Sequence, residues 1–289
     1  MRLPIKLNKA GWPSPFADLF LAFHDPRPLA YKPFAISAAQ FSASVSSLQF
    51  GVTFKTTHPG RHAQSNRFLR ETYRGSRPVI LDVGASDGST SLDLIQELGS
   101  NFAYYYVTDL NLSVRCGYDS KGVVYFVDQN GSCILRASER LLVYSNTSRA
   151  RFPLRLIART LLAKCRNAGG WRNLVLIQPA LRRRAKCDPR IIIQRYDIFA
   201  PWTGPPPDLV KVANLLNNDY FSDSQIKKAL QVQCSILAPN GRLLLISEDQ
   251  DIEKFSVFRK TPAGMELELT HAGGAKASPH VAQVYLSKR

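Results

Sequence analysis

The chain has 289 residues, and its formal net charge of +16 comes from 38 Lys and Arg against 22 Asp and Glu. A hydrophobic fraction of 45% excludes a disordered chain and favours one α/β domain with additions. The excess positive charge indicates either an anionic partner, such as RNA or a membrane surface, or simply a solvated basic surface.

Cysteine usage and apolar runs narrow the class of protein further. The cysteines are odd in number and widely scattered, with no Cys-x-x-Cys pair, so we expect neither a metal site nor a disulfide framework, and a reducing cytoplasm fits. They are Cys116, Cys133, Cys165, Cys187 and Cys234. No apolar run reaches the length of a membrane span, and the run at 16–23 is too short for a signal peptide and contains Asp18.

Residues 1–60 are rich in Pro, Ser and aromatic residues, and we expect a partly irregular tail or lid. An α/β domain is then expected over 61–289, interrupted by an insertion at about 115–170. Its first helix, at 62–74, leads into the first strand. The start of this helix brings several polar residues close to the first strand. Their alternative role is to form a solvated surface. They are Arg61, His62, Gln64 and Arg67.

The stretch 78–98 predicts a buried strand, a glycine turn and a helix. Val79-Ile80-Leu81 is a continuous apolar run, as in a parallel strand covered on both faces. Gly84 and Gly88 allow a sharp turn that brings bare backbone against a ligand, while the helix N-terminus favours a polar or anionic group. A second apolar run, 102–108, ends at Asp109, at the distance typical of a ribose-binding carboxylate.

The predicted insertion contains a hairpin, with strands at 123–127 and 133–135 around an Asn-Gly turn, and a third strand at 141–144. A basic amphipathic helix follows at 153–166, and a basic cluster lies at 182–186. Two interpretations stay open for these basic segments: binding to RNA or a membrane surface, or packing on the sheet with a solvated basic face.

The rest of the chain predicts further strands and one long helix. Strands are expected at 191–193 and 242–246, and 208–216 is expected to form another strand with the loop at its carboxyl end. The helix at 222–237 begins with a capping box formed by Ser222 and Gln225. A closing pair of strands is expected at 265–270 and 281–286.

The order of these motifs resembles the class I S-adenosylmethionine (SAM)-dependent methyltransferases. The resemblance rests on Asp82-x-Gly84-x-x-x-Gly88, Asp109, Asp197, Asn214 and the segment 237–241. It implies a Rossmann-like fold, with a mostly parallel seven-stranded sheet and helices on both faces, carrying an inserted β-hairpin and helix. It also implies SAM as cofactor and an unidentified methyl acceptor.

The resemblance assigns ten residues to the cofactor site, with Asp109 at the ribose, and Asp197 and Ile198 at the adenine. The ten are Asp82, Gly84, Ala85, Ser86, Gly88, Asp109, Leu110, Asp197, Ile198 and Asn214. Asn214 and Tyr220 are the candidates for positioning the acceptor, no catalytic base is identified, and no metal is expected. The segment 214–221 is similar to the post-strand motif of the chemotaxis receptor glutamate methyltransferases, although Asn217-Asn218-Asp219 interrupts it.

Two other functions stay open. A methyltransferase-fold protein without activity could serve as a nucleic-acid or membrane-binding module, but the intact Asp82, Gly84, Gly88 and Asp109 argue against a decayed pocket. A nucleotide-sugar or NAD enzyme is less compatible, because the Gly-x-Gly-x-x-Gly spacing is absent.

Overall fold

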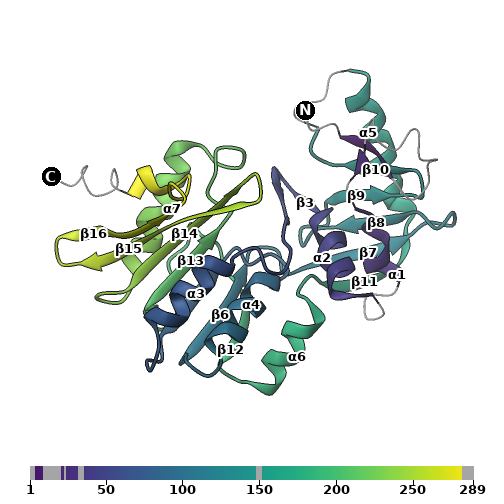
Figure 1. Ribbon diagram of the computed structural model, residues 1–289. Coiled ribbons are helices and arrows are strands. Elements are labelled where there is room, and N and C mark those ends of the chain that lie inside the picture. Colours follow the sequence, from purple (N-terminus) through teal and green to yellow (C-terminus); the bar gives the residue numbers. More distant parts are fainter. Residues whose placement is uncertain (1–3, 9–20, 23, 32–35, 148–151, 282–289) are drawn as a thin grey trace. The chain divides into compact units, whose positions relative to one another are not determined.

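The computed structural model describes residues 4–8, 21–22, 24–31, 36–147 and 152–281 (Figure 1). The chain divides into two compact units. Unit 1 comprises Met1–His58 and Asn111–Pro179, and unit 2 comprises Pro59–Leu110 and Ala180–Arg289. The N-terminal segment and the insertion, which the sequence suggests as separate additions, therefore belong to the same unit.

Unit 2 is built on a seven-stranded sheet in the order β12-β6-β5-β13-β14-β15-β16. The first five strands pair in parallel, and the last two continue the sheet antiparallel. This is the mostly parallel Rossmann-like sheet predicted from the sequence. The strands are β5 (Val79–Val83), β6 (Tyr104–Asp109), β12 (Ile191–Arg195), β13 (Leu209–Ala213), β14 (Arg242–Asp249), β15 (Ile252–Thr261) and β16 (Gly264–His271).

Helices cover both faces of this sheet (Figure 1). Helix α7 begins with the predicted capping box, in which Ser222 and Gln225 satisfy each other's backbone N–H groups, and it packs into the main apolar core of the unit. On the opposite face, Ser91 of α4 donates a hydrogen bond to Asp82 of β5. The helices of the unit are α3 (Ala63–Thr72), α4 (Ser89–Leu98), α6 (Pro179–Cys187, starting at the unit boundary) and α7 (Asp223–Ile236).

The closing strands differ from the prediction. The strand expected at 265–270 is confirmed as β16, but its partner is β15, which the sequence analysis missed. The buried segment of β15, 255–258, is short and is flanked by charged residues at both ends of the strand, so no long apolar run marks it. Of the other predicted strand, 281–286, Val281 is helical and the remaining residues lie outside the described chain.

Unit 1 contains a second seven-stranded sheet, in the order β11-β7-β8-β9-β10-β1-β2. The predicted hairpin and third strand are confirmed as β8, β9 and β10, with Asp128 accepting backbone N–H groups across the Asn-Gly turn. The strands of this sheet are β1 (Ile5–Asn8), β2 (Leu21–Ala22), β7 (Ser113–Tyr118), β8 (Val124–Val127), β9 (Cys133–Ala137), β10 (Leu141–Tyr144) and β11 (Gly169–Val175).

Short helices and a small hairpin complete unit 1. They are α1 (Arg27–Tyr31), α2 (Ala38–Ser46), the hairpin of β3 (Gln49–Phe50) and β4 (Thr53–Phe54), α5 (Leu154–Ala163) and a 3₁₀ helix (Lys164–Asn167). Within the described part of the chain, no helix is long and apolar enough to cross a membrane.

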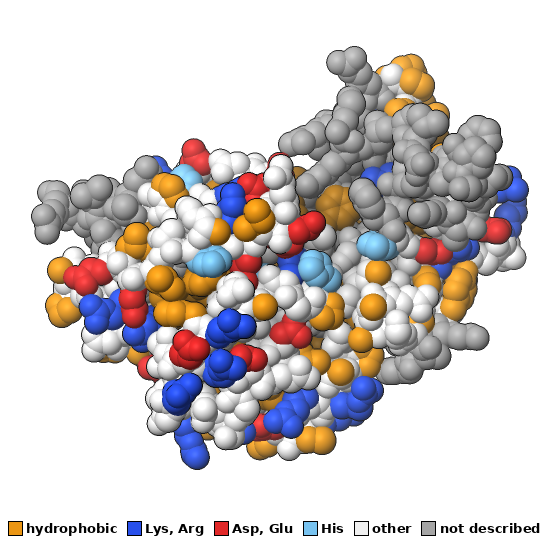
Figure 2. All heavy atoms as spheres, in the orientation of Figure 1, with side chains coloured by type: hydrophobic (Ala, Val, Ile, Leu, Met, Phe, Trp, Pro, Cys, Tyr) orange, Lys and Arg blue, Asp and Glu red, His pale blue; other side chains and the backbone are white. Residues whose placement is uncertain are grey.

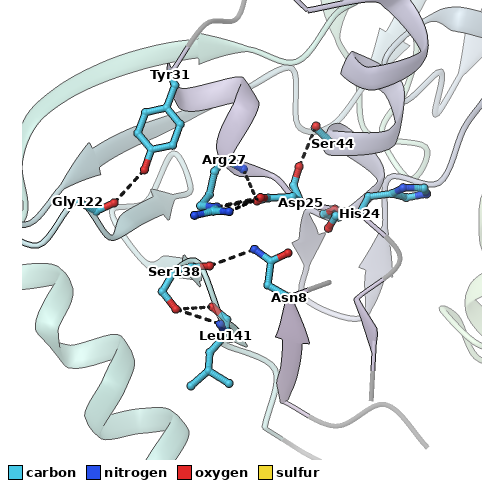
Figure 3. Close-up of polar contacts among 10 residues, drawn as sticks. Asn8, His24, Asp25, Arg27, Tyr31, Ser44, Gly122, Ser138 and Leu141 are labelled. Carbon is cyan, nitrogen blue, oxygen red and sulfur yellow. Dashed lines mark hydrogen bonds and ion pairs between the residues drawn. The ribbon is translucent and has the colours of Figure 1, made fainter. Parts of the chain in front are cut away.

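The two segments of unit 1 are joined by strand pairing, packing and polar contacts (Figure 3). Strand β1 pairs antiparallel with β10, and Asn8 Nδ2 donates to the Ser138 carbonyl at 3.1 Å. The Tyr31 hydroxyl donates to the Gly122 carbonyl at 2.9 Å. Apolar side chains of α1 and α2 lie in one core with those of β7 to β10. The N-terminal segment is therefore an integral part of this sheet's core.

Candidate functional site

The carboxyl ends of the five parallel strands of unit 2 lie at one edge of the sheet. Strand order runs outward from β5 to β6 and β12 on one side, and from β13 to β14 on the other. The connections therefore leave β5 and β13 in opposite directions, and the topological switch point lies between the carboxyl ends of these two strands. In open α/β sheets this switch point is where ligands bind.

The turn after β5 has the unusual backbone that the glycines predict. Gly84, Ser86 and Gly88 have φ angles of 72°, 60° and 79°, in the left-handed region that favours glycine. The turn is fixed to the neighbouring strand because Ala85 N–H donates to the Thr108 carbonyl at 2.9 Å. The Asp87 carboxylate accepts the backbone N–H and the hydroxyl of Ser89 at the start of α4.

Protein side chains lie against both glycines. A Cβ atom at Gly84 would lie 2.7 Å from Leu215 Cδ2, and a Cβ at Gly88 would overlap Leu181 of α6. The sequence analysis explains both glycines by the approach of a ligand. The structure packs Leu181 against Gly88, and it places Leu215 of the loop after β13 over Gly84, at the switch point.

Asp109 lies beside this turn, as its position at the end of a strand predicts. Its Oδ2 accepts the backbone N–H of Ser86 at 2.9 Å, so the carboxylate and the turn form one polar surface. The following residue, Leu110, is exposed. A carboxylate so placed has the chemistry needed to bind a vicinal diol.

Asp82, one of the predicted cofactor residues, makes its contacts in the core below the turn. Its Oδ2 accepts hydrogen bonds from Ser91 and Tyr105, each at 2.8 Å, and lies 3.0 Å from the ammonium of Lys211. Both charged side chains are buried, with 2% and 0% exposed. Burial, together with the Asp82 charge, raises the pKa of Tyr105 well above its ordinary value, so the phenol remains a donor. The observed role of Asp82 is to tie β5, α4, β6 and β13 together.

Asp197 and Ile198, expected near the adenine, follow β12 at the same edge. Asp197 Oδ1 accepts the backbone N–H of Phe199 at 3.0 Å, which closes a local turn. Ile198 is buried, and its carbonyl accepts a hydrogen bond from Gln233 of α7. These contacts give both residues a structural role in shaping the loop.

A strand-end cluster, formed by Arg61, His62, Asn214 and Glu248, lies on the other side of the switch point. Arg61 is ion-paired with Glu248, and Asn214 Nδ2 lies 3.5 Å from His62 Nε2. Asn214 Oδ1 accepts the backbone N–H of Glu248 at 2.8 Å, which holds Asn214 in its left-handed conformation (φ 54°). The cluster connects the start of α3 to the ends of β13 and β14.

Sequence analysis found only part of this cluster. It placed Arg61 and His62 near the first strand and Asn214 at the strand end, but Glu248 follows an apolar strand without any motif. Tyr220, the other candidate for positioning an acceptor, is half-buried in the loop before α7, where its N–H donates to the Asn217 carbonyl. Among the described residues, no three His, Cys, Asp or Glu side chains are grouped closely enough to hold a metal ion.

Comparisons with known proteins give structural likeness only. No protein-family model matches the chain, and no curated protein sequence matches it. The N-methyltransferase NodS from Bradyrhizobium japonicum, solved with S-adenosylhomocysteine, gives a TM-score of 0.33 at 15% identity, over 65% of this chain and 62% of that one. An O-methyltransferase family protein from Burkholderia thailandensis gives a TM-score of 0.35 at 11% identity, over 78% of this chain and 45% of that one. YcgJ from Bacillus subtilis gives a TM-score of 0.33 at 12% identity, over 65% of this chain and 51% of that one. The chain thus spans about half to three fifths of the length of these structures.

Proposed function

We propose that this chain is a SAM-dependent methyltransferase whose cofactor binds at the switch point of unit 2. The observation that supports this most directly is the left-handed turn after β5 lying in contact with the Asp109 carboxylate at the end of β6. A helix N-terminus beside a carboxylate suits a ligand that combines a polar tail with a ribose.

The residues proposed to hold the cofactor divide by the part of SAM they would meet. The backbone at Gly84, Ala85, Ser86 and Gly88 would form the floor, and Asp109 with Leu110 would meet the ribose. Asp197 and Ile198 would meet the adenine, while Asp82 would act indirectly by holding the turn. Leu215 would have to rotate away from Gly84. Bound SAM supplies an activated methyl group, so the chain's own task is to align the acceptor and exclude water.

The acceptor would approach from the strand-end cluster. Asn214, fixed by its bond to the Glu248 N–H, would position it. His62 is the member of the cluster with a side chain suited to accept a proton near neutral pH, and Tyr220 lies in the loop that follows. The likeness of segment 214–221 to the chemotaxis receptor methyltransferases supports no choice of acceptor. Among the described residues no two cysteines form a disulfide, and a reducing, cytoplasmic setting is part of the proposal.

Calorimetry of the full chain with S-adenosylhomocysteine tests the proposal. We expect saturable binding, and we expect Asp109→Asn to weaken it by about 1.5–3 kcal/mol, because charge-assisted hydrogen bonds to the ribose are lost. Glu266→Gln is the matched control, since it also neutralises one carboxylate but lies exposed on β16. Its affinity should equal that of the parent.

Thermal melts establish that the Asp109 variant is folded before its affinity is interpreted. Absence of binding by the parent protein, or equal binding by folded Asp109→Asn, would remove the cofactor from this site. Displacement of S-adenosylhomocysteine by NAD at comparable concentration would replace the methyltransferase proposal with a dinucleotide enzyme.

A further inference from the structure

Helix α5 of unit 1 presents large apolar side chains to solvent. It lies against β9 and β10, yet Ala158 is the one residue of the helix that is buried. Leu156 is 55% exposed and Ile157 is 44% exposed, while Phe152, just before the helix, is 82% exposed. Figure 2 shows hydrophobic side chains on the outer surface where α5 lies in Figure 1. The helix therefore has an outward apolar side in addition to the side that packs on the sheet.

The same helix is strongly basic. Arg155 and Arg159 are exposed beside the apolar side chains, and Lys164 and Arg166 follow in the 3₁₀ helix. Residues 140–179, which form the second half of the unit 1 insertion, contain eight Lys or Arg and no Asp or Glu. The exposed apolar side chains thus lie in a segment of net positive charge, which favours a partner with negative charge.

Two anionic partners fit the charge, but the apolar side chains distinguish them. A nucleic acid would pair its phosphates with the arginines and leave Leu156 and Ile157 in water, because base stacking uses aromatic or guanidinium faces. A lipid interface takes up both groups at once: arginines reach the headgroup phosphates while Phe152, Leu156 and Ile157 enter the boundary with the acyl chains. On RNA, the exposed side chains of Leu156 and Ile157 would have no comparable binding partner.

We propose that the α5 face, formed by Phe152, Arg155, Leu156, Ile157 and Arg159, docks onto bilayers that contain anionic lipid. The helix lies in the plane of the interface and does not cross the bilayer, since it has only 10 residues. Docking needs both the apolar side chains and the charges, because a single weak anchor gives only marginal binding. This inference is independent of the proposed methyl transfer, and it answers the question that the sequence left open for the basic helix.

Co-sedimentation with vesicles tests the docking. The full chain is mixed with vesicles of phosphatidylcholine plus phosphatidylserine, and with vesicles of phosphatidylcholine alone, at low and high salt. We expect binding to the anionic vesicles that falls with salt, and at least about tenfold weaker binding to the neutral ones. Leu156→Ser with Ile157→Ser should reduce anionic binding about tenfold or more, and Arg155→Gln with Arg159→Gln should reduce both the binding and its dependence on salt.

The matched control is Leu267→Ser, which removes a leucine that is 57% exposed on β16, against 55% for Leu156. It should bind vesicles as the parent does, and all variants should melt at the parent temperature because the changed side chains are exposed. Equal loss in the control, equal binding to neutral vesicles, or no binding would overturn the proposal. RNA binding without vesicle binding would also overturn it, because the face would then bind nucleic acid. A dimer in sedimentation velocity that Leu156→Ser abolishes would overturn it too, because the face would then bind a second copy of the chain.

Discussion

The buried pair of Asp82 and Lys211 gives the sharpest test of how unit 2 is held together. The two residues lie directly opposite each other on β5 and β13, with Nζ 3.0 Å from Oδ2. At that separation and an effective dielectric constant of about 20, their attraction is roughly 5–6 kcal/mol. Taking both charges out of water costs a comparable amount, so the pair adds little net stability. Removing one partner is different, because the other charge then stays buried without compensation.

We therefore expect Lys211→Met and Asp82→Asn each to lower the free energy of unfolding of unit 2 by about 3–5 kcal/mol. The double variant should cost clearly less than the sum, since no buried charge remains. Native-state hydrogen exchange, read from peptides that cover β5 and β13, measures this for unit 2 alone and avoids assuming that both units unfold together.

A surface pair provides the control. Lys254 Nζ also lies 3.0 Å from a carboxylate oxygen, that of Asp249, but these side chains are 29% and 46% exposed. Lys254→Met should cost less than about 1 kcal/mol, because solvent screens the pair. If Lys211→Met were equally mild, or if the double variant cost the full sum of the two single ones, the reasoning from burial would be refuted.

Two further predictions concern the switch point and the alkaline limit of stability. Leu215→Ala uncovers Gly84, so S-adenosylhomocysteine should bind about two- to tenfold more tightly in calorimetry. The gain corresponds to the rotamer cost of displacing the leucine, which is of order 0.5–1.5 kcal/mol. Weaker binding would contradict the proposed position of the ligand. Burial raises the pKa of Tyr73 from 10.0 to about 12. The unfolded chain therefore loses this proton first, and stability falls as pH rises from about 10 to about 12, at up to roughly 1.4 kcal/mol per pH unit. Tyr73→Phe should remove that part of the decline, and thermal melts that decline equally in both proteins would refute it.

The parallel sheet could be predicted because its signals are local. Apolar runs mark β5, β6 and β14, predominantly apolar residues mark β13, and the capping box marks the start of α7. What could not be predicted is contact between distant residues. Lys211 interrupts an apolar strand, and only the register with β5 shows that it faces Asp82. The cover that Leu215 forms over Gly84 likewise requires the loop after β13 to be placed.

The architecture of unit 1 could not be predicted from the sequence for a related reason. Its β1 alternates apolar and polar residues, but it is only four residues long, which is too short to identify a strand, and its partner β10 lies more than a hundred residues later. Pro and aromatic residues around it suggested an irregular tail. Strand β15, which pairs with β14 and β16, was missed because charged residues at both of its ends leave only the short segment 255–258 apolar.

The interleaving of the two units sets the order in which they can be completed during synthesis. Residues 1–58 of unit 1 are synthesised first, and residues 59–110 of unit 2 follow. All strands of unit 1 are present only once residue 175 has left the ribosome. At that moment β5 and β6 exist without β12 or β13, and Asp82 has no lysine beside it. The nascent chain therefore holds a completed unit 1 with an unfinished sheet looped out of it. A ribosome stalled after unit 1 would display a folded unit 1 and a protease-sensitive segment at 59–110.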